Sequence, residues 1–227
     1  MSTTAKKKPP LRRQDAALAA AEQAQKRRRV TWLLSGIAAV VALAVLYAVF
    51  STSPAKNTSS GGTSYDVGSP GVGKNAPAFT LTASTGKQIS LSDYRGKNVL
   101  LYFQEGLTCQ PCWDQIADLE KSAAKVKAAG VDDIVSITTD PADLITRKTN
   151  DMGLSTPVLS DPNLKISKQY ETNQYGMMGT SRDGHSFLLV GPDGTIRWRA
   201  DYDGAPDYTM YVAVDKLFGD LKAGVKS

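Results

Sequence analysis

The chain has little of the two residue types that most often build metal sites and disulfide frameworks. It has 227 residues but one histidine, His185, and two cysteines, Cys109 and Cys112. A structural zinc site usually takes two pairs of Cys or His ligands, and no second pair is present. A structural disulfide is also disfavoured, because a C-x-x-C pair closes a small ring and constrains the unfolded chain little.

Excess positive charge is missing from most of the chain, although the net charge is +5. Residues 1–29 carry nine Lys or Arg against two acidic residues, a net of +7, which leaves −2 for the other 198 residues. The basic character therefore belongs to an N-terminal tail. A nearly neutral remainder argues against a nucleic-acid-binding domain.

One long hydrophobic run follows the tail. Val30–Phe50 has 21 residues without charge or proline, and Trp32 and Tyr47 lie near its two ends. About 20 apolar residues let a helix cross a bilayer, and aromatic residues are common at both interfaces. The alternative is a cleaved signal peptide, whose apolar region is shorter, ~7–15 residues, and ends in small residues. The run predicts an uncleaved anchor, and the basic cluster Lys26–Arg29 predicts a cytoplasmic N-terminus.

Small and polar residues dominate the segment after the predicted anchor. Of the 22 residues from 51 to 72, 15 are Ser, Gly, Thr or Pro, which leaves too little apolar surface for a core. We therefore expect a basic cytoplasmic tail (1–29), a transmembrane anchor (30–50), a flexible linker (51–72) and one folded domain (73–227).

Hydrophobic periodicity predicts alternating strands and helices in residues 73–227. Asp140 and Asp161 are each followed by proline, which predicts capped helix starts. Alternation of this kind predicts a central sheet with helices on both faces. The expected strands are Phe79–Leu81, Ile89–Leu91, Asn98–Phe103, Asp133–Thr139, Pro157–Leu159, Phe187–Val190 and Thr195–Asp201. The expected helices run from Cys109 to Gly130, Asp140 to about Met152, Asp161 past Tyr170, and Met210 to Leu221.

The two cysteines lie where a buried strand gives way to a helix. Pro111 stands where the first turn of a helix accepts proline, so Cys109 is at or just before the helix N-terminus. Unpaired N–H groups and the helix dipole favour a thiolate there, which lowers the pKa of Cys109 below about 8.5. Cys112, one turn on, can close a disulfide with it. This pattern predicts thiol–disulfide exchange, with zinc binding and a structural disulfide as alternatives.

Four segments occur in a recognisable order: Gly73–Leu81, Ser90–Lys97, Cys109–Cys112 and Phe187–Gly194. Through these four segments, residues 73–227 resemble the thioredoxin-like superfamily. The resemblance is to its branch of alkyl hydroperoxide reductase and thiol-specific antioxidant proteins (redoxins). The resemblance implies a thioredoxin-like α/β fold, a central mixed sheet flanked by helices, with an N-terminal β-hairpin extension. With the predicted anchor, the chain is similar to membrane-tethered thiol–disulfide oxidoreductases associated with cytochrome c maturation. In those proteins the first cysteine attacks and the second resolves, which would be Cys109 and Cys112.

The sequence departs from this family at two places. Peroxiredoxins keep the signature P-x-x-x-T-x-x-C; here Cys112 falls at the peroxidatic cysteine, but Cys109 takes the threonine position and Glu105 or a neighbour the proline position. Thioredoxins place a cis-proline before the penultimate strand. This chain has none there; His185 falls near that position, and Arg182 lies just upstream. The mismatch with the peroxiredoxin signature weakens the peroxidase interpretation, and a thiol peroxidase is the alternative enzyme.

His185 has three interpretations. It is a polar residue at a strand start, or it lies across from Cys109, where it would stabilise the thiolate or shuttle a proton. The third comes from copper chaperones of the cytochrome oxidase assembly type, which share the fold and use two cysteines and a histidine. Thiolates and imidazole suit copper, although the usual spacing in those proteins is C-x-x-x-C.

Five further residues are candidate neighbours of the disulfide. Thr108 precedes the motif, and Gln110 and Pro111 would set its geometry and so tune its reduction potential. Trp113 would shield the disulfide or pack at the helix start. Glu105 would accept a proton from the resolving thiol or would be a solvated loop acid.

These residues together predict a membrane-anchored extracytoplasmic thiol–disulfide oxidoreductase. Its partners would be protein thiols and disulfides outside the cytoplasm and a membrane donor or acceptor of electrons, with no nucleic acid. Its redox group would be the Cys109–Cys112 disulfide, with no metal and no other cofactor. The alternatives are a thiol peroxidase, a copper-binding assembly chaperone using Cys109, Cys112 and His185, and lastly an inert anchored binding module.

Overall fold

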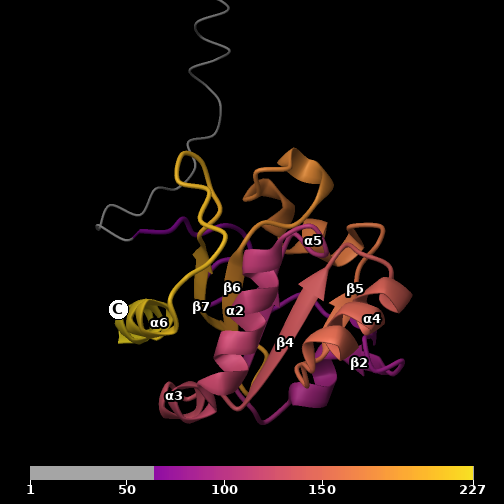
Figure 1. Cartoon of the computed structure of the whole chain (residues 1–227). Helices are drawn as coiled ribbons and strands as arrows, with labels where there is room; N and C mark the ends of the chain where they lie inside the picture. The colour runs from indigo at the N-terminus through magenta and orange to yellow at the C-terminus, as the bar shows by residue number, and fades with distance from the viewer. Residues whose placement is uncertain (1–63, 227) are drawn as a thin grey trace, which may run out of the picture. The chain divides into compact units, whose positions relative to one another are not determined.

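A seven-stranded mixed sheet organises residues 64–226, the part of the chain that the computed structural model describes (Figure 1). The strand order is β2-β1-β5-β4-β3-β6-β7. β3 pairs in parallel with β4 and β4 with β5, while the other neighbours are antiparallel. The strands are β1 Thr80–Ala83, β2 Gln88–Ser90, β3 Val99–Phe103, β4 Asp133–Thr138, β5 Val158–Ser160, β6 Ser186–Val190 and β7 Ile196–Asp201. The mixed α/β sheet and its N-terminal hairpin confirm that part of the predicted fold.

Helices cover both faces of the sheet. α2, α4 and α6 contribute Trp113, Ile145 and Leu217 to one apolar cluster, and α5 and η1 contribute Ile166 and Leu91 to the other. The helices are η1 Leu91–Tyr94, α2 Gln110–Lys121, α3 Ala123–Ala128, α4 Ala142–Met152, α5 Lys165–Gln169, η2 Thr172–Gln174, η3 Gly179–Ser181 and α6 Val214–Lys226.

The position of β3 inside the sheet explains why its sequence is apolar without interruption. Tyr102 points into the cluster under α2, while Leu101 and Phe103 point into the opposite cluster. A strand buried on both faces has no exposed positions and therefore shows no alternation. This strand carries the chain from the middle of the sheet to the C-x-x-C motif.

The predicted helix from Cys109 to Gly130 is in fact two helices. Ser122 has φ −99° and ψ 26°, which ends α2, and α3 follows at an angle to it (Figure 1). Serine is a poor helix former, and the break turns the chain back toward β4. Gly130 follows the end of α3 with a φ of 80°, a left-handed conformation that glycine adopts more easily than other residues.

Three of the predicted helix starts differ in the structure. Asp140 does not cap α4; Pro141 takes that place, and the Asp140 carboxylate binds elsewhere. The helix expected from Asp161 begins only at Lys165, with Leu164 as its N-cap, although the Asp161 carboxylate does accept backbone N–H groups from its first turn. The last helix begins at Val214, so Met210 lies outside it.

Ordered structure begins before Gly73. Asp66 pairs with Asp201 at the end of β7, and the Gly68 N–H donates to the Asp201 carboxylate at 2.7 Å. Residues 64–72 of the expected linker thus have partners along the edge of the sheet. The expected tail (1–29), anchor (30–50) and remaining linker (51–63) lie outside the described residues. Within residues 64–226, no helix has both the length and the apolar character needed to cross a bilayer.

Candidate active site

Cys109 and Cys112 form a disulfide at the start of α2. Their sulfurs are 2.05 Å apart and their Cα atoms 5.4 Å apart. Cys109 is the N-cap of the helix, and its Sγ accepts the Cys112 N–H at 3.2 Å. Cys109 is 4% exposed and Cys112 is fully buried. The predicted placement at a helix start is therefore confirmed, and Cys109 is the more accessible of the two sulfurs.

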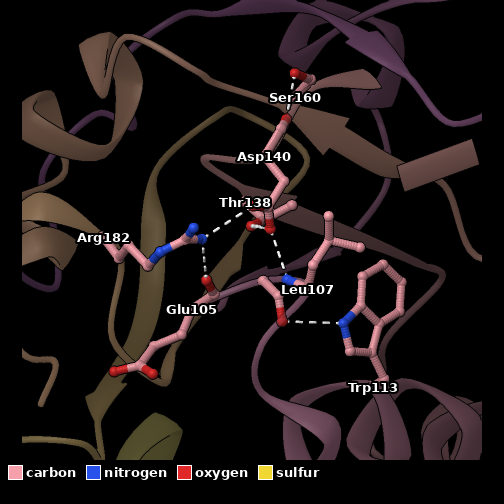
Figure 2. A network of polar contacts seen from close by, with 8 residues as sticks. Glu105, Leu107, Trp113, Thr138, Asp140, Ser160 and Arg182 are labelled. Atoms are coloured by element: carbon pink, nitrogen blue, oxygen red, sulfur yellow. Dashed lines mark hydrogen bonds and ion pairs between the residues drawn. The ribbon is translucent and has the colours of Figure 1, made fainter. Parts of the chain in front are cut away.

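The loop between β3 and the cysteines is held by Asp140, which follows β4 (Figure 2). One oxygen of its carboxylate accepts the Leu107 N–H at 2.6 Å and the Thr138 hydroxyl at 3.2 Å. The other oxygen pairs with Arg182 at 3.0 Å, and the same Arg182 nitrogen donates to the Glu105 carbonyl at 2.8 Å. Arg182, a predicted neighbour of the site, thus acts on the loop before the cysteines.

Gly106 makes this close approach possible. A Cβ at this position would lie 1.8 Å from the Asp140 carboxylate and 2.4 Å from the Thr138 hydroxyl. Its φ of 95° is also a conformation that side-chain-bearing residues rarely adopt. The Gly106 carbonyl in turn accepts the Cys109 N–H at 2.9 Å and the Trp113 indole N–H at 3.0 Å.

The exposed side of the motif carries a cation. Lys148 of α4 donates to the Gln110 side-chain oxygen at 2.8 Å and lies 5.9 Å from the centroid of the Trp113 ring. The Gln110 amide nitrogen donates to Asp114 at 2.8 Å. Trp113 is fully buried and packs at the helix start, while Thr108, Gln110 and Pro111 are exposed.

A pair of acids lies on the inner side of the loop. Glu105 is 3% exposed, so it is not a solvated loop acid, and its carboxylate accepts the Met177 N–H at 3.1 Å. It interacts with Asp203, a buried residue, and the Met177 N–H acts on both carboxyls. Burial, and then the charge of Glu105, raise the pKa of Asp203 to about 7. Burial raises the pKa of Glu105 as well, so the pair retains a proton more readily than separate acids would.

His185 lies in the same interior and not at the surface facing Cys109. Its Nδ1 is 2.9 Å from the Tyr102 hydroxyl, and its Nε2 is 3.4 Å from the Gln115 side-chain oxygen. That oxygen already accepts the Val212 N–H at 2.8 Å, which assigns the imidazole proton to Nε2 and leaves Nδ1 as the acceptor. Burial lowers the pKa of His185 to about 3, so the ring is neutral.

The interior position of His185 bears on two of its three interpretations. A ring that stays neutral does not take up a proton near neutral pH, so this position does not favour the shuttle interpretation. Both ring nitrogens face protein groups, so a copper ion would have to displace one of them. Within the described residues, no group of three or more His, Cys, Asp or Glu side chains is arranged to hold a metal. The copper alternative gains no support from this arrangement.

Sequence reasoning missed Tyr102, Asp140, Lys148 and Asp203. Tyr102 was expected only as part of a buried strand, yet its hydroxyl lies 3.3 Å from the Cys112 carbonyl, and burial and both acids raise its pKa. Asp140 had a detectable signal, because polar residues at the carboxyl ends of neighbouring parallel strands meet at one edge of a sheet. Lys148 and Asp203 lie in segments that carry no local signal.

A mixed sheet that delivers a C-x-x-C disulfide to a helix start defines a thioredoxin-like thiol oxidoreductase. The comparison with known families names the branch. The AhpC/TSA family matches residues 72–199, and this chain belongs to it. The predicted redoxin membership is therefore confirmed, and the protein is an oxidoreductase.

Relatives within this family carry two chemistries. The peroxiredoxin Bcp of Escherichia coli K12 is 32% identical over 127 residues, covering 55% of this chain and 81% of that protein. The thiol-disulfide oxidoreductase ResA of Bacillus thuringiensis is 36% identical over 126 residues, covering 55% of this chain and 66% of that protein. The crystal structure of peroxidoxin BcpB from Mycobacterium tuberculosis superposes with a TM-score of 0.56 at 18% identity, over 67% of this chain and 96% of that one. That last likeness concerns the fold alone.

Proposed function

We propose that this protein exchanges disulfides with protein partners through Cys109 and Cys112. The observation that supports this most is the position of the Cys109 sulfur, which replaces the usual N-cap oxygen and accepts the Cys112 N–H at 3.2 Å. A thiolate at this position would keep that hydrogen bond and gain the field of a 12-residue helix. Cys109 is also the sulfur that a partner can approach, because Cys112 is fully buried.

In the reductive direction, the Cys109 thiolate attacks one sulfur of the partner's disulfide. A bond forms between Cys109 and that sulfur, and the partner's second sulfur leaves as a thiolate and takes a proton. The Cys112 thiol then loses its proton and attacks the Cys109 sulfur. The partner is released as its second thiolate and takes the proton that Cys112 lost. Two electrons have then passed to the partner, and its other proton comes from solvent, because Cys109 attacked as a thiolate. The reverse sequence oxidises a partner dithiol.

The proton of Cys112 needs an acceptor, and the Glu105–Asp203 pair is a candidate with a raised pKa. The pair acts electrostatically on Tyr102, whose hydroxyl lies against the Cys112 carbonyl, so all these groups share one interior. A carboxyl pair that binds its first proton with a pKa of about 7 can accept that proton and return it near neutral pH.

Two serine variants of the full chain test the order of attack. In Cys109→Ser, turnover with a disulfide substrate should be abolished. In Cys112→Ser, a covalent mixed disulfide between Cys109 and the partner should accumulate, because no thiol resolves it. Undiminished reduction of disulfides by Cys109→Ser would overturn the assignment.

A thiol peroxidase is the second candidate, favoured by the peroxiredoxin relatives and by the position of Cys112 in their signature. Here the Cys112 thiolate would attack the peroxide O–O bond, forming a sulfenic acid and releasing water or an alcohol. Cys109 would then attack the sulfenic sulfur, forming the disulfide and releasing water. A single-turnover loss of hydroperoxide that survives in Cys109→Ser but not in Cys112→Ser would favour this chemistry over disulfide exchange.

The proposed location is a single-pass membrane protein with the redox domain outside the cytoplasm. The support is the uncharged run Val30–Phe50 and the basic cluster Lys26–Arg29 before it. Its partners would then be protein thiols and disulfides outside the cytoplasm, with a membrane protein as donor or acceptor of electrons. External protease should cleave the redox domain of intact spheroplasts, and protection from it would contradict this orientation.

A further inference from the structure

The cation on the exposed side of the C-x-x-C motif has an unusually defined position for a lysine. Lys148 lies in α4, 38 residues from Gln110 in the sequence, and its ammonium group donates to the Gln110 side chain at 2.8 Å. It also lies 5.9 Å from the centroid of the Trp113 ring, within the range of a cation–π interaction. Gln110 follows Cys109 inside the motif, and Trp113 follows Cys112, so the ammonium group contacts the residue next to each cysteine.

The groups that hold Lys148 are themselves fixed. The Trp113 indole donates to the Gly106 carbonyl at 3.0 Å, and the same carbonyl accepts the Cys109 N–H at 2.9 Å. The Gln110 amide is oriented by Asp114 at 2.8 Å. The lysine therefore does not merely sample the solvent near the motif; it has a preferred place beside the first cysteine.

The other charges around Cys109 nearly cancel or are kept neutral. Asp140, at the end of β4, is paired with Arg182 at 3.0 Å. Glu105 and Asp203, from the loops after β3 and β7, form the pair that holds a proton. Asp114 of α2 is an exposed acid that opposes the lysine. Lys148 is therefore the positive charge on this side of the motif that no carboxylate neutralises among the described contacts.

We propose that Lys148 is a positioning residue of the redox site, whose charge favours the thiolate form of Cys109 and thereby sets its reactivity. This inference rests on the proposed role of Cys109 as the attacking cysteine. The interaction is electrostatic and passes over the exposed side chain of Gln110, so it should weaken with salt. It adds to the effect of the helix start and does not replace it, since the backbone N–H of Cys112 would still reach the sulfur.

The test measures the thiolate of Cys109 directly. In the full chain carrying Cys112→Ser, Cys109 is the only thiol, and its rate of alkylation by iodoacetamide as a function of pH gives its pKa. Adding Lys148→Met should raise that pKa by about half a unit at low salt, which slows alkylation roughly threefold below the pKa. At about 1 M salt, where the Debye length is about 3 Å, most of the difference should disappear. Lys148→Arg should keep the wild-type profile.

Arg147→Met is the matched control, because Arg147 lies in the same helix, is exposed, and pairs only with Asp143 at 3.7 Å. It removes the same charge and should leave the pKa of Cys109 unchanged. Equal profiles for Lys148→Met and its parent, or equal shifts for both charge removals, would overturn the proposal. Failure of the chain with both cysteines intact to exchange disulfides would count against the proposed function, but the alkylation profile would still decide the role of Lys148.

Discussion

Two buried acidic clusters flank the loop that leads into the disulfide, and they are built in opposite ways. On one side, the single carboxylate of Asp140 meets three donors, from Leu107, Thr138 and Arg182 (Figure 2). On the other, Glu105 and Asp203 are two carboxyls with the N–H groups of Met177 and Met178 as donors and no ion pair among the described residues. The first cluster is charged and satisfied; the second can avoid repulsion only by retaining a proton.

This difference separates two tasks that a dithiol site requires. The satisfied cluster fixes the backbone of residues 105–107 and hence the position of Cys109, because each donor it receives belongs to that loop or to an element beside it. The under-satisfied cluster is poorly suited to holding a fixed geometry but well suited to exchanging a proton. Removing a carboxylate charge should therefore lower the free energy of unfolding at Asp140 and leave it unchanged or raise it at Asp203.

The largest effect should come from filling the space that the satisfied cluster requires. Gly106→Ala would place a Cβ 1.8 Å from the Asp140 carboxylate, at a φ of 95°. We expect a loss of about 3 kcal/mol or more in the free energy of unfolding, from strain and displaced hydrogen bonds together. Denaturant unfolding of the oxidised full chain measures it.

Gly130→Ala is the control for that loss. Gly130 has a similar φ of 80°, but a Cβ there meets nothing within 4 Å. It should cost only about 1 kcal/mol, the price of the backbone conformation alone. Equal losses for the two variants would mean that Asp140 yields easily and does not hold the loop.

The next prediction compares the two acidic clusters by the sign of the stability change when one carboxylate in each is neutralised. Asp140→Asn removes the charge that faces Arg182 and offers one acceptor where three donors converge, so it should destabilise the protein by about 2 kcal/mol. Asp203→Asn removes one acid from a pair of acids, and its side-chain oxygen can still accept the Met177 N–H. It should be neutral or stabilising by up to about 1 kcal/mol at pH 8. Unfolding midpoints of both variants in the same buffer decide the matter, and losses of the same sign and size would remove the distinction.

The sequence predicted the local secondary structure around this site but not its long-range contacts. The strand before the cysteines, Pro111 in the first turn and the helix beyond are all consequences of neighbouring residues. The assignment of Asp140 as a helix cap failed because Asp-Pro is a local signal, whereas its carboxylate serves a loop 33 residues away. The role of His185 stayed open for the same reason: its partner Tyr102 is 83 residues distant. Register between strands, which no single segment encodes, decides such contacts.

A smaller effect concerns the pH dependence of stability. Burial and the charge of Glu105 raise the pKa of Asp203 from 3.8 to about 7, so the folded state binds a proton more tightly than the unfolded state. That stabilisation is complete below about pH 4 and is lost as the pH rises toward 7. The difference in unfolding free energy between Asp203→Asn and wild type should therefore shift in favour of the variant across this window and level off above it.

Asp183 supplies a control for this window, since burial raises its pKa to about 7 as well and its carboxylate bonds neither Glu105 nor Asp203 among the described contacts. Its partners are the hydroxyls of Ser167 and Thr172. Asp183→Asn should show the same trend with pH, and the two effects should add, because the sites share no partner. A pH-independent difference for Asp203→Asn alone would mean that Glu105 and Asp203 do not share a proton.

The last prediction is that the NMR signals of His185 do not change with pH. It tests whether the ring beside the acid pair stays neutral. His185 is fully buried against Tyr102 and Gln115, and burial lowers its pKa to about 3. Because it is the only histidine, its ring gives a single set of NMR signals. These should stay fixed between about pH 5 and 8, whereas an exposed histidine would titrate near 6.5. Titration in that range would show that water and protons reach the ring, would restore its role as a proton shuttle, and would leave the Glu105–Asp203 pair without a distinct task.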